Sequence, residues 1–142
     1  MHVQNLGRRH AARARLFIAT MSRHPFDLLM ELPDEHIRLD CAALHLARDR
    51  YADVDMRRSI AQLDALADEV FKRRVGIAAN LRYEALRAVL VDQHRFAGDA
   101  EDYYNPRNCY LNRVLDTRHG LPIALSIVWI EVARRLKWPV SG

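Results

Sequence analysis

The chain has 142 residues and a formal net charge of +4, and 50% of its residues are hydrophobic, so it can form one domain with a core. Five arginines and no acid lie within residues 1–26, whereas the other 116 residues carry 17 basic and 18 acidic side chains. The basicity therefore belongs to the N-terminal segment. Most of the chain lacks the basic surface typical of a nucleic-acid-binding domain.

Residues 1–24 predict a flexible basic tail. They show no amphipathic pattern, and Met21 could be the true start of the protein. Nucleic acid or an acidic lipid is not an expected partner, because only the tail would contact it, through four arginines. These are Arg8, Arg9, Arg13 and Arg15.

Residues 25–96 predict a succession of helices. A short turn is expected around residues 26–30. Pro33 with two following acids indicates a helix start, and this helix should run to about Tyr51. Asp53 or Asp55 caps the next helix, which Gly76 ends, and a fourth helix covers residues 80–96, with Leu81 among its inner residues. The inner stripe of the second long helix is Met56, Ile60, Leu63, Ala67 and Val70.

Residues 97–107 predict an irregular stretch, after which Asn108 caps a short helix that Gly120 stops. Pro122 then occupies the first turn of a last helix, residues 121–136. This helix is apolar around most of its circumference, so we expect Val128, Trp129 and Val132 to be incompletely covered and the chain to self-associate. Two acid–arginine pairs are expected at helix surfaces, Glu131 with Arg135 and Glu69 with Arg73.

Residues 96–136 also carry a motif in three groups: Phe96 and Gly98; Asp102, Tyr103, Tyr104, Pro106, Asn108 and Leu111; and Val114, Leu115, Arg118, Gly120, Pro122, Ile123 and Leu125. This motif resembles the signature of SirB-type proteins, bacterial proteins in which tetratricopeptide-type helices follow a transglutaminase-like domain. The resemblance implies that residues 25–142 are all-α as they stand. They would form the helical N-terminal half of a transglutaminase-like (papain-like) α+β domain, truncated before the family's histidine segment.

The resemblance also implies a lost active site. Active transglutaminase-like domains carry an Arg-x-Gly-x-Cys motif at the start of the core helix. Here Arg118 and Gly120 match that motif, but Pro122 occupies the nucleophile's position. Because proline has no side chain that can attack a carbonyl, we expect a non-catalytic protein-interaction or scaffolding domain.

The alternative is a cysteine hydrolase or transferase that uses Cys109, which stands where the family usually has serine. Cys109 would lie at a helix start, where a thiolate is favoured, and its histidine would come from missing sequence. His119, ten residues on, should be roughly 15 Å away at the far end of that helix. Cys41 with His45, and His36 with Asp40, have the spacing of metal ligands but lack further ligands, so we expect no metal or other cofactor.

The loop before the short helix is the predicted binding surface, because adjacent tyrosines beside an arginine can grip a peptide. Its residues are Asp102, Tyr103, Tyr104, Arg107 and Asn108. An ordered loop with its rings packed on the core is the simpler interpretation. With two isolated cysteines, no signal peptide and no apolar stretch long enough to span a bilayer, we expect a cytoplasmic location and an unidentified protein partner.

Overall fold

The computed structural model describes residues 23–74 and 76–140, which form two compact units divided between Ile37 and Arg38. The first unit contains α2 (Pro25–Leu29) and the 3-10 turn η1 (Asp34–His36). The short turn expected at residues 26–30 is confirmed by α2. The tail arginines Arg8, Arg9, Arg13 and Arg15, and Met21, lie outside the described residues.

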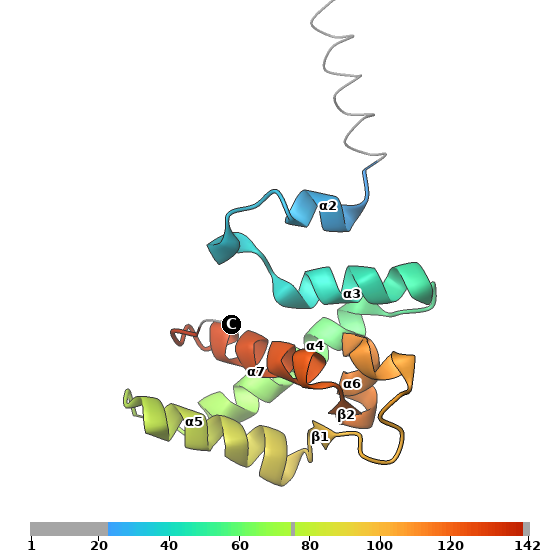
Figure 1. Cartoon of the computed structure of the whole chain (residues 1–142). Helices are drawn as coiled ribbons and strands as arrows, with labels where there is room; N and C mark the ends of the chain where they lie inside the picture. The colour runs from blue at the N-terminus through green and yellow to red at the C-terminus, as the bar shows by residue number, and fades with distance from the viewer. Residues whose placement is uncertain (1–22, 75, 141–142) are drawn as a thin grey trace, which may run out of the picture. The chain divides into compact units, whose positions relative to one another are not determined.

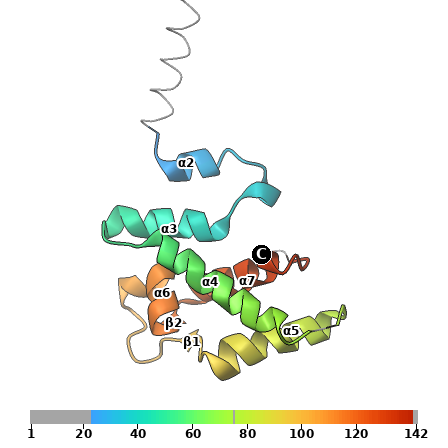
Figure 2. The ribbon, with the colours of Figure 1, turned by 180° about the vertical axis from the view of Figure 1, so that it is seen from behind.

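The second unit is a helical assembly with one pair of very short strands. Its elements are α3 (Leu39–Arg50), α4 (Met56–Phe71), α5 (Ala79–Arg87), the π-helical turn η2 (Ala88–Gln93), β1 (Ala97–Gly98), the 3-10 turn η3 (Pro106–Cys109), α6 (Leu111–Thr117), β2 (His119–Gly120) and α7 (Pro122–Arg135). Figures 1 and 2 show α4 and α7 between α3 on one side and α5 on the other, with α6 and the strands at one end.

The predicted helical fold is confirmed, but the sequence pattern missed the two short strands and a π-helical turn. The strands pair in parallel, with Ala97 opposite His119 and Gly98 opposite Gly120. Two residues are too few to show the alternation that identifies a strand. The helix expected at residues 80–96 ends as a π-helical turn, and Leu81 is exposed rather than inner.

The predicted start of the helix at Pro33 is wrong, because α3 begins only at Leu39 and ends at Arg50. Two carboxylates explain this start. The Leu39 N–H donates to Glu131 Oε1 at 3.1 Å, and the Cys41 N–H donates to Asp40 Oδ1 at 2.7 Å. The first N–H groups of a helix need acceptors, and negative charge there is favoured. Glu131 is 92 residues away in the chain, so no local pattern indicates this cap.

The core lies between α4, α6 and α7. The neighbouring helices cover much of the apolar surface of α7. Val128 and Val132 have no exposed surface, and Trp129 stacks on Tyr83 with ring centroids 5.7 Å apart. The expectation of incomplete cover is therefore wrong for Val128 and Val132, because α3, α4 and α6 all pack on α7, but it holds for Trp129, which stays partly exposed. None of the helices in the described part of the chain combines the length and hydropathy needed to cross a membrane.

Gly120 does not stop α6 as expected. The helix ends at Thr117, and Arg118 adopts the left-handed conformation with φ of 67°. Gly120 is instead a point of close approach, since an added Cβ would lie 2.3 Å from a methyl of Val114 and 3.0 Å from the Asn108 carbonyl oxygen. The glycine is needed for packing between β2 and α6, not for a turn.

Candidate functional site

The first turn of α7 holds Pro122, the residue that the motif placed at the position of a nucleophile. Pro122 is the first helical residue, after Leu121 in an extended conformation, and its side chain is exposed. Its carbonyl accepts a hydrogen bond from Ser126 Oγ at 2.8 Å. Residues 122–125 are Pro, Ile, Ala and Leu, so this turn offers neither a thiol nor an imidazole.

The other motif residues lie just before this turn. The Arg118 guanidinium lies 4.8 Å from the centroid of the Phe96 ring, and burial lowers the pKa of Arg118. Its Nη1 is buried and has no hydrogen-bond partner within the described residues. His119 is exposed, and its Nδ1 lies 2.9 Å from the Thr117 carbonyl oxygen, so the imidazole is directed at its own turn.

Cys109 is not at the start of an α-helix, contrary to the prediction. It is the last residue of η3, and α6 begins two residues later at Leu111. Its exposed thiol donates to the Pro106 carbonyl oxygen at 2.8 Å. Cys109 therefore lies outside the first turn of α6, one residue before its N-cap Tyr110.

The segments that flank α6 lie closer together than the predicted separation of Cys109 from His119 suggests. The left-handed residue Arg118 turns the chain back, so that the Leu121 N–H donates to the Asn108 carbonyl oxygen at 2.9 Å. Residues that flank the helix on both sides are thus neighbours. Even so, no hydrogen bond links the Cys109 thiol to an imidazole in residues 23–74 and 76–140.

The loop before η3 is held by its own polar side chains. The Asp99 carboxylate accepts hydrogen bonds from the Asp102 N–H at 2.9 Å and from Asn108 Nδ2 at 3.1 Å. The backbone bond from Asp102 is the main cause that lowers the pKa of Asp99. Asn108 also donates to the Asp102 carbonyl at 2.7 Å and is buried. Asn108 therefore fixes the loop and is not available to a ligand.

The same loop exposes its aromatic residues. Tyr103 and Tyr104 meet edge to face with centroids 5.4 Å apart, and Tyr104 is 93% exposed. The interpretation in which both rings pack on the core is wrong. Arg107 is also exposed, and its guanidinium lies 5.3 Å from the centroid of Tyr51. The loop thus exposes two aromatic rings and a cation, and hydrogen bonds within the loop fix its backbone.

A small polar pocket lies beside Arg107. Its volume is about 220 Å³, and seven residues line it: Tyr51, Asp53, Arg107, Tyr110, Asn112, Arg113 and Asp116. We call it the Arg107 pocket. Sequence reasoning missed it, because its walls come from the α3–α4 connection, from η3 and from α6, which share no contiguous motif.

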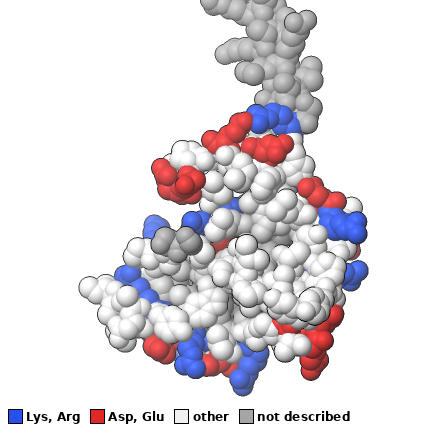
Figure 3. Space-filling view, in the orientation of Figure 1, with Lys and Arg blue, Asp and Glu red and all other residues white. Residues whose placement is uncertain are grey.

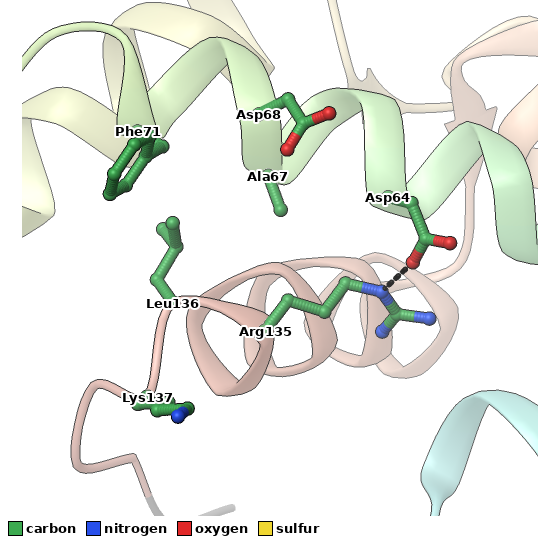
Figure 4. Close-up of a pocket in the computed structure, with 7 residues that line it drawn as sticks. All are labelled: Asp64, Ala67, Asp68, Phe71, Arg135, Leu136 and Lys137. Carbon is green, nitrogen blue, oxygen red and sulfur yellow. Dashed lines mark hydrogen bonds and ion pairs between the residues drawn. The ribbon is translucent and has the colours of Figure 1, made fainter.

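The sequence predicted that Glu131 and Arg135 pair at the surface of a helix. In the structure this pair is instead part of a buried network. Arg135 Nη2 lies 2.6 Å from Asp40 Oδ2, its Nη1 3.0 Å from Glu131 Oε2 and its Nε 2.6 Å from Asp64 Oδ1. The side chain of Asp40 is 0% exposed and that of Glu131 4%. Figure 4 shows Arg135 reaching from α7 to Asp64 on α4, at one side of a hollow that includes Phe71.

Hydrogen bonds within the network shift the pKa of Asp40 and that of Arg135 in the direction of the charged form. Burial raises the pKa of Asp40, but the hydrogen bonds from Arg38 and Arg135 outweigh it, so the net pKa lies below its ordinary value of 3.8. Burial lowers the pKa of Arg135, but its bonds to Asp40 and Asp64 raise it overall. The network therefore joins α3, α4 and α7 as a structural tie.

The remaining predicted pairs are used elsewhere. Asp40 belongs to the buried network, and burial raises the pKa of the Cys41 thiol next to it. Glu69 does not pair with Arg73, because its Oε2 lies 2.7 Å from both Gln93 Nε2 and His94 Nε2. Within the described ranges, no group of three or more His, Cys, Asp or Glu residues is arranged to hold a metal ion.

A second hollow of about 300 Å³ lies between α5 and α7. Tyr83, Trp129 and Trp138 line it, and the Arg82 guanidinium lies 5.5 Å from the Trp138 ring. Figure 3 shows that the face of the second unit over α5 and α7 is mostly uncharged, with acidic and basic side chains at its margins. This surface is apolar, whereas the Arg107 pocket is polar.

Comparisons with known proteins match most of the second unit. A family model described as transglutaminase-like superfamily matches residues 57–142. The UPF0162 protein of Xylella fastidiosa strain Temecula1 is 36% identical over 121 residues, which is 80% of this chain and 41% of that protein. The UPF0162 protein of Vibrio cholerae is 25% identical over 114 residues, which is 80% of this chain and 40% of that protein.

Human F-box only protein 21 is 28% identical over 139 residues, which is 79% of this chain and 22% of that protein. The chain thus spans less than half the length of these curated relatives. No solved structure matches it at the same significance.

Proposed function

This chain belongs to the transglutaminase-like superfamily, and from that membership we propose that it is a non-catalytic member that binds a partner protein. We propose further that it is of the SirB type, in which tetratricopeptide-type helices follow the domain, and that it acts in the cytoplasm as an interaction or scaffolding module.

The residue at position 122 carries this proposal. Arg118 and Gly120 match the family's Arg-x-Gly-x-Cys motif, and Pro122 begins α7 where the cysteine would stand. A cysteine protease-like mechanism needs a thiolate within hydrogen-bond reach of a base. Proline supplies neither a thiol nor a proton to transfer, and it suits the first turn of a helix.

The proposed protein contact rests on the loop at residues 102–108. Tyrosine and arginine are enriched among the residues that dominate binding energy at protein interfaces. Tyr103, Tyr104 and Arg107 are exposed on a loop that Asn108 holds in place, so little conformational entropy is lost when a partner binds.

An activity assay tests the non-catalytic half of the proposal. The full chain and the Xylella fastidiosa relative are incubated with a glutamine-donor substrate and with a peptide substrate, and product is measured. We expect no turnover above buffer. Turnover that Cys109→Ala abolishes and Cys41→Ala preserves would refute the proposal and favour the alternative, a cysteine hydrolase or transferase with a histidine from outside this sequence.

Site-specific cross-linking tests the binding half. A photoreactive phenylalanine analogue replaces Tyr104 in the full chain, and in a control it replaces Phe71, which is also exposed. We expect a discrete cross-linked protein from position 104 and none from position 71. Equal labelling from both positions would indicate non-specific contact and contradict the proposed surface.

A further inference from the structure

The Arg107 pocket has an aromatic wall that orients a cation. The rings of Tyr51 and Tyr110 meet edge to face with centroids 5.4 Å apart, and the Arg107 guanidinium lies against the Tyr51 face at 5.3 Å. A cation–π contact of this kind holds the guanidinium over the ring. An arginine guanidinium can donate two parallel hydrogen bonds to a carboxylate.

Among the described residues, the arginines of the pocket have no acidic partner in an ion pair. Neither Arg107 nor Arg113 forms an ion pair in the part of the chain that the structure describes. Asp116 does not neutralise them, because it already accepts hydrogen bonds from Arg58 and Gln62, both at 3.2 Å. Two cations and two carboxylates line the pocket, but Arg58, which lies outside the lining, pairs with Asp116. Arg107 and Arg113 are therefore left opposite Asp53 alone, which suits an anion.

The pocket also retains an acceptor. Asp53 is exposed and forms no ion pair among the described residues. A carboxylate here disfavours a bare multivalent anion such as phosphate. It favours an acidic residue within a peptide, because the neighbouring backbone N–H groups of the peptide can donate to it. The volume of about 220 Å³ is below the roughly 300–1,000 Å³ of pockets that hold whole small molecules, and so fits one side chain.

We infer that the Arg107 pocket binds a glutamate or aspartate side chain from an extended segment of a partner protein. Arg107 and Arg113 donate to its carboxylate, and Asp53 accepts a backbone N–H beside it. This inference rests on the proposed protein-binding function and adds the chemistry of the partner.

Nuclear magnetic resonance of the full chain tests the inference. The probe is N-acetylglutamate N-methylamide, the control is the glutamine analogue, and the signals are the Nε–Hε groups of Arg107 and Arg113. We expect saturable shifts at millimolar glutamate analogue and at least tenfold weaker binding of the glutamine analogue. Binding of the charged probe should weaken in 0.5 M salt, because partly exposed charges are screened.

Matched variants locate the binding. Arg113→Ala should weaken the glutamate analogue at least tenfold, whereas Lys72→Ala, which also removes one exposed positive charge, should leave it unchanged. Since Arg113 is exposed, its variant should fold, which far-UV circular dichroism checks. If Arg113→Ala misfolds, Arg113→Gln is measured instead, with the same expected loss.

Three results would overturn the inference: equal binding of the glutamine analogue, stronger binding of inorganic phosphate at the same signals, or undiminished binding by the folded Arg113 variant. None of them decides the protein-binding proposal, which cross-linking from position 104 tests separately, or the non-catalytic proposal, which the turnover assay tests.

Discussion

Arg135→Met removes the guanidinium that joins Asp40, Glu131 and Asp64 and keeps an unbranched apolar side chain in its place. Asp40 and Glu131 stay buried after the change and lose a charged partner. Arg38 still pairs with Asp40 at 2.8 Å, and Arg134 with Glu131 at 3.3 Å. Each of the two carboxylates therefore loses one cationic partner and keeps another.

The magnitude follows from this geometry. Removing one partner of a buried ion pair costs about 3–5 kcal/mol, because the other charge remains buried. The surviving partners of Asp40 and Glu131 place the expected loss near the lower end, about 3 kcal/mol. That is a large share of the roughly 5–15 kcal/mol by which a domain is stable.

Urea unfolding followed by far-UV circular dichroism measures this loss. With a slope of about 2 kcal/mol per molar urea, the midpoint should fall by about 1.5 M. Arg58→Met is the matched control, because its ion pair with Asp116 lies at the surface, with side chains 67% and 46% exposed. A surface pair contributes about 0–1 kcal/mol, so its midpoint should move by less than about 0.5 M.

Equal midpoint shifts for Arg135→Met and Arg58→Met would refute the reasoning. If Arg135→Met does not fold, Arg135→Lys is measured instead, because lysine keeps a cation but not the planar guanidinium that reaches three carboxylates. Its midpoint should still fall by more than that of Arg58→Met. An equal or smaller fall would contradict the reasoning.

Three further outcomes are expected. Gly120→Ala should lower the unfolding temperature, because overpacking at this position costs about 1–3 kcal/mol. Gly98→Ala is the control and should not lower it, since an added Cβ there meets nothing within 4 Å. Equal shifts of the two variants in calorimetry would contradict this expectation. Because the pKa of Asp40 is lowered on folding, its stabilising contribution is complete above its unfolded pKa of about 3.9 and is lost as pH falls through the lower folded pKa. Urea midpoints between pH 5 and pH 2 should therefore fall less steeply in Asp40→Asn, and an identical slope would exclude Asp40 as a cause. At pH 8 a thiol reagent should modify the exposed Cys109 before Cys41, because burial raises the pKa of the Cys41 thiol. The variant Cys109→Ala should therefore show only the slow reaction. A fast reaction in that variant would disprove the predicted order.

Features that depend on neighbours within one or two turns could be predicted from the sequence. The inner stripe of α4 was correct for its buried residues Leu63, Ala67 and Val70, and Asp55 caps that helix by accepting the Arg58 N–H at 3.0 Å. The start of α7 at Pro122 was also predicted, because proline and periodicity act locally.

Features that depend on contacts between distant segments were decided by the tertiary structure. Arg135 and Asp40 are 95 positions apart and meet only because α7 packs against α3. The same packing places Glu131 at the N-terminus of α3 and moves the start of that helix to Leu39. The Arg107 pocket likewise needs α6 beside the end of α3.

These contacts have no signature in sequence spacing, since the energy of an ion pair or cap depends on distance in space and on burial. An acid and an arginine four residues apart on a helix look alike whether solvent or another helix covers them. The pattern therefore fixed which segments of this protein are helical, and the packing of those helices decided which of their charged side chains are buried and which can meet a ligand.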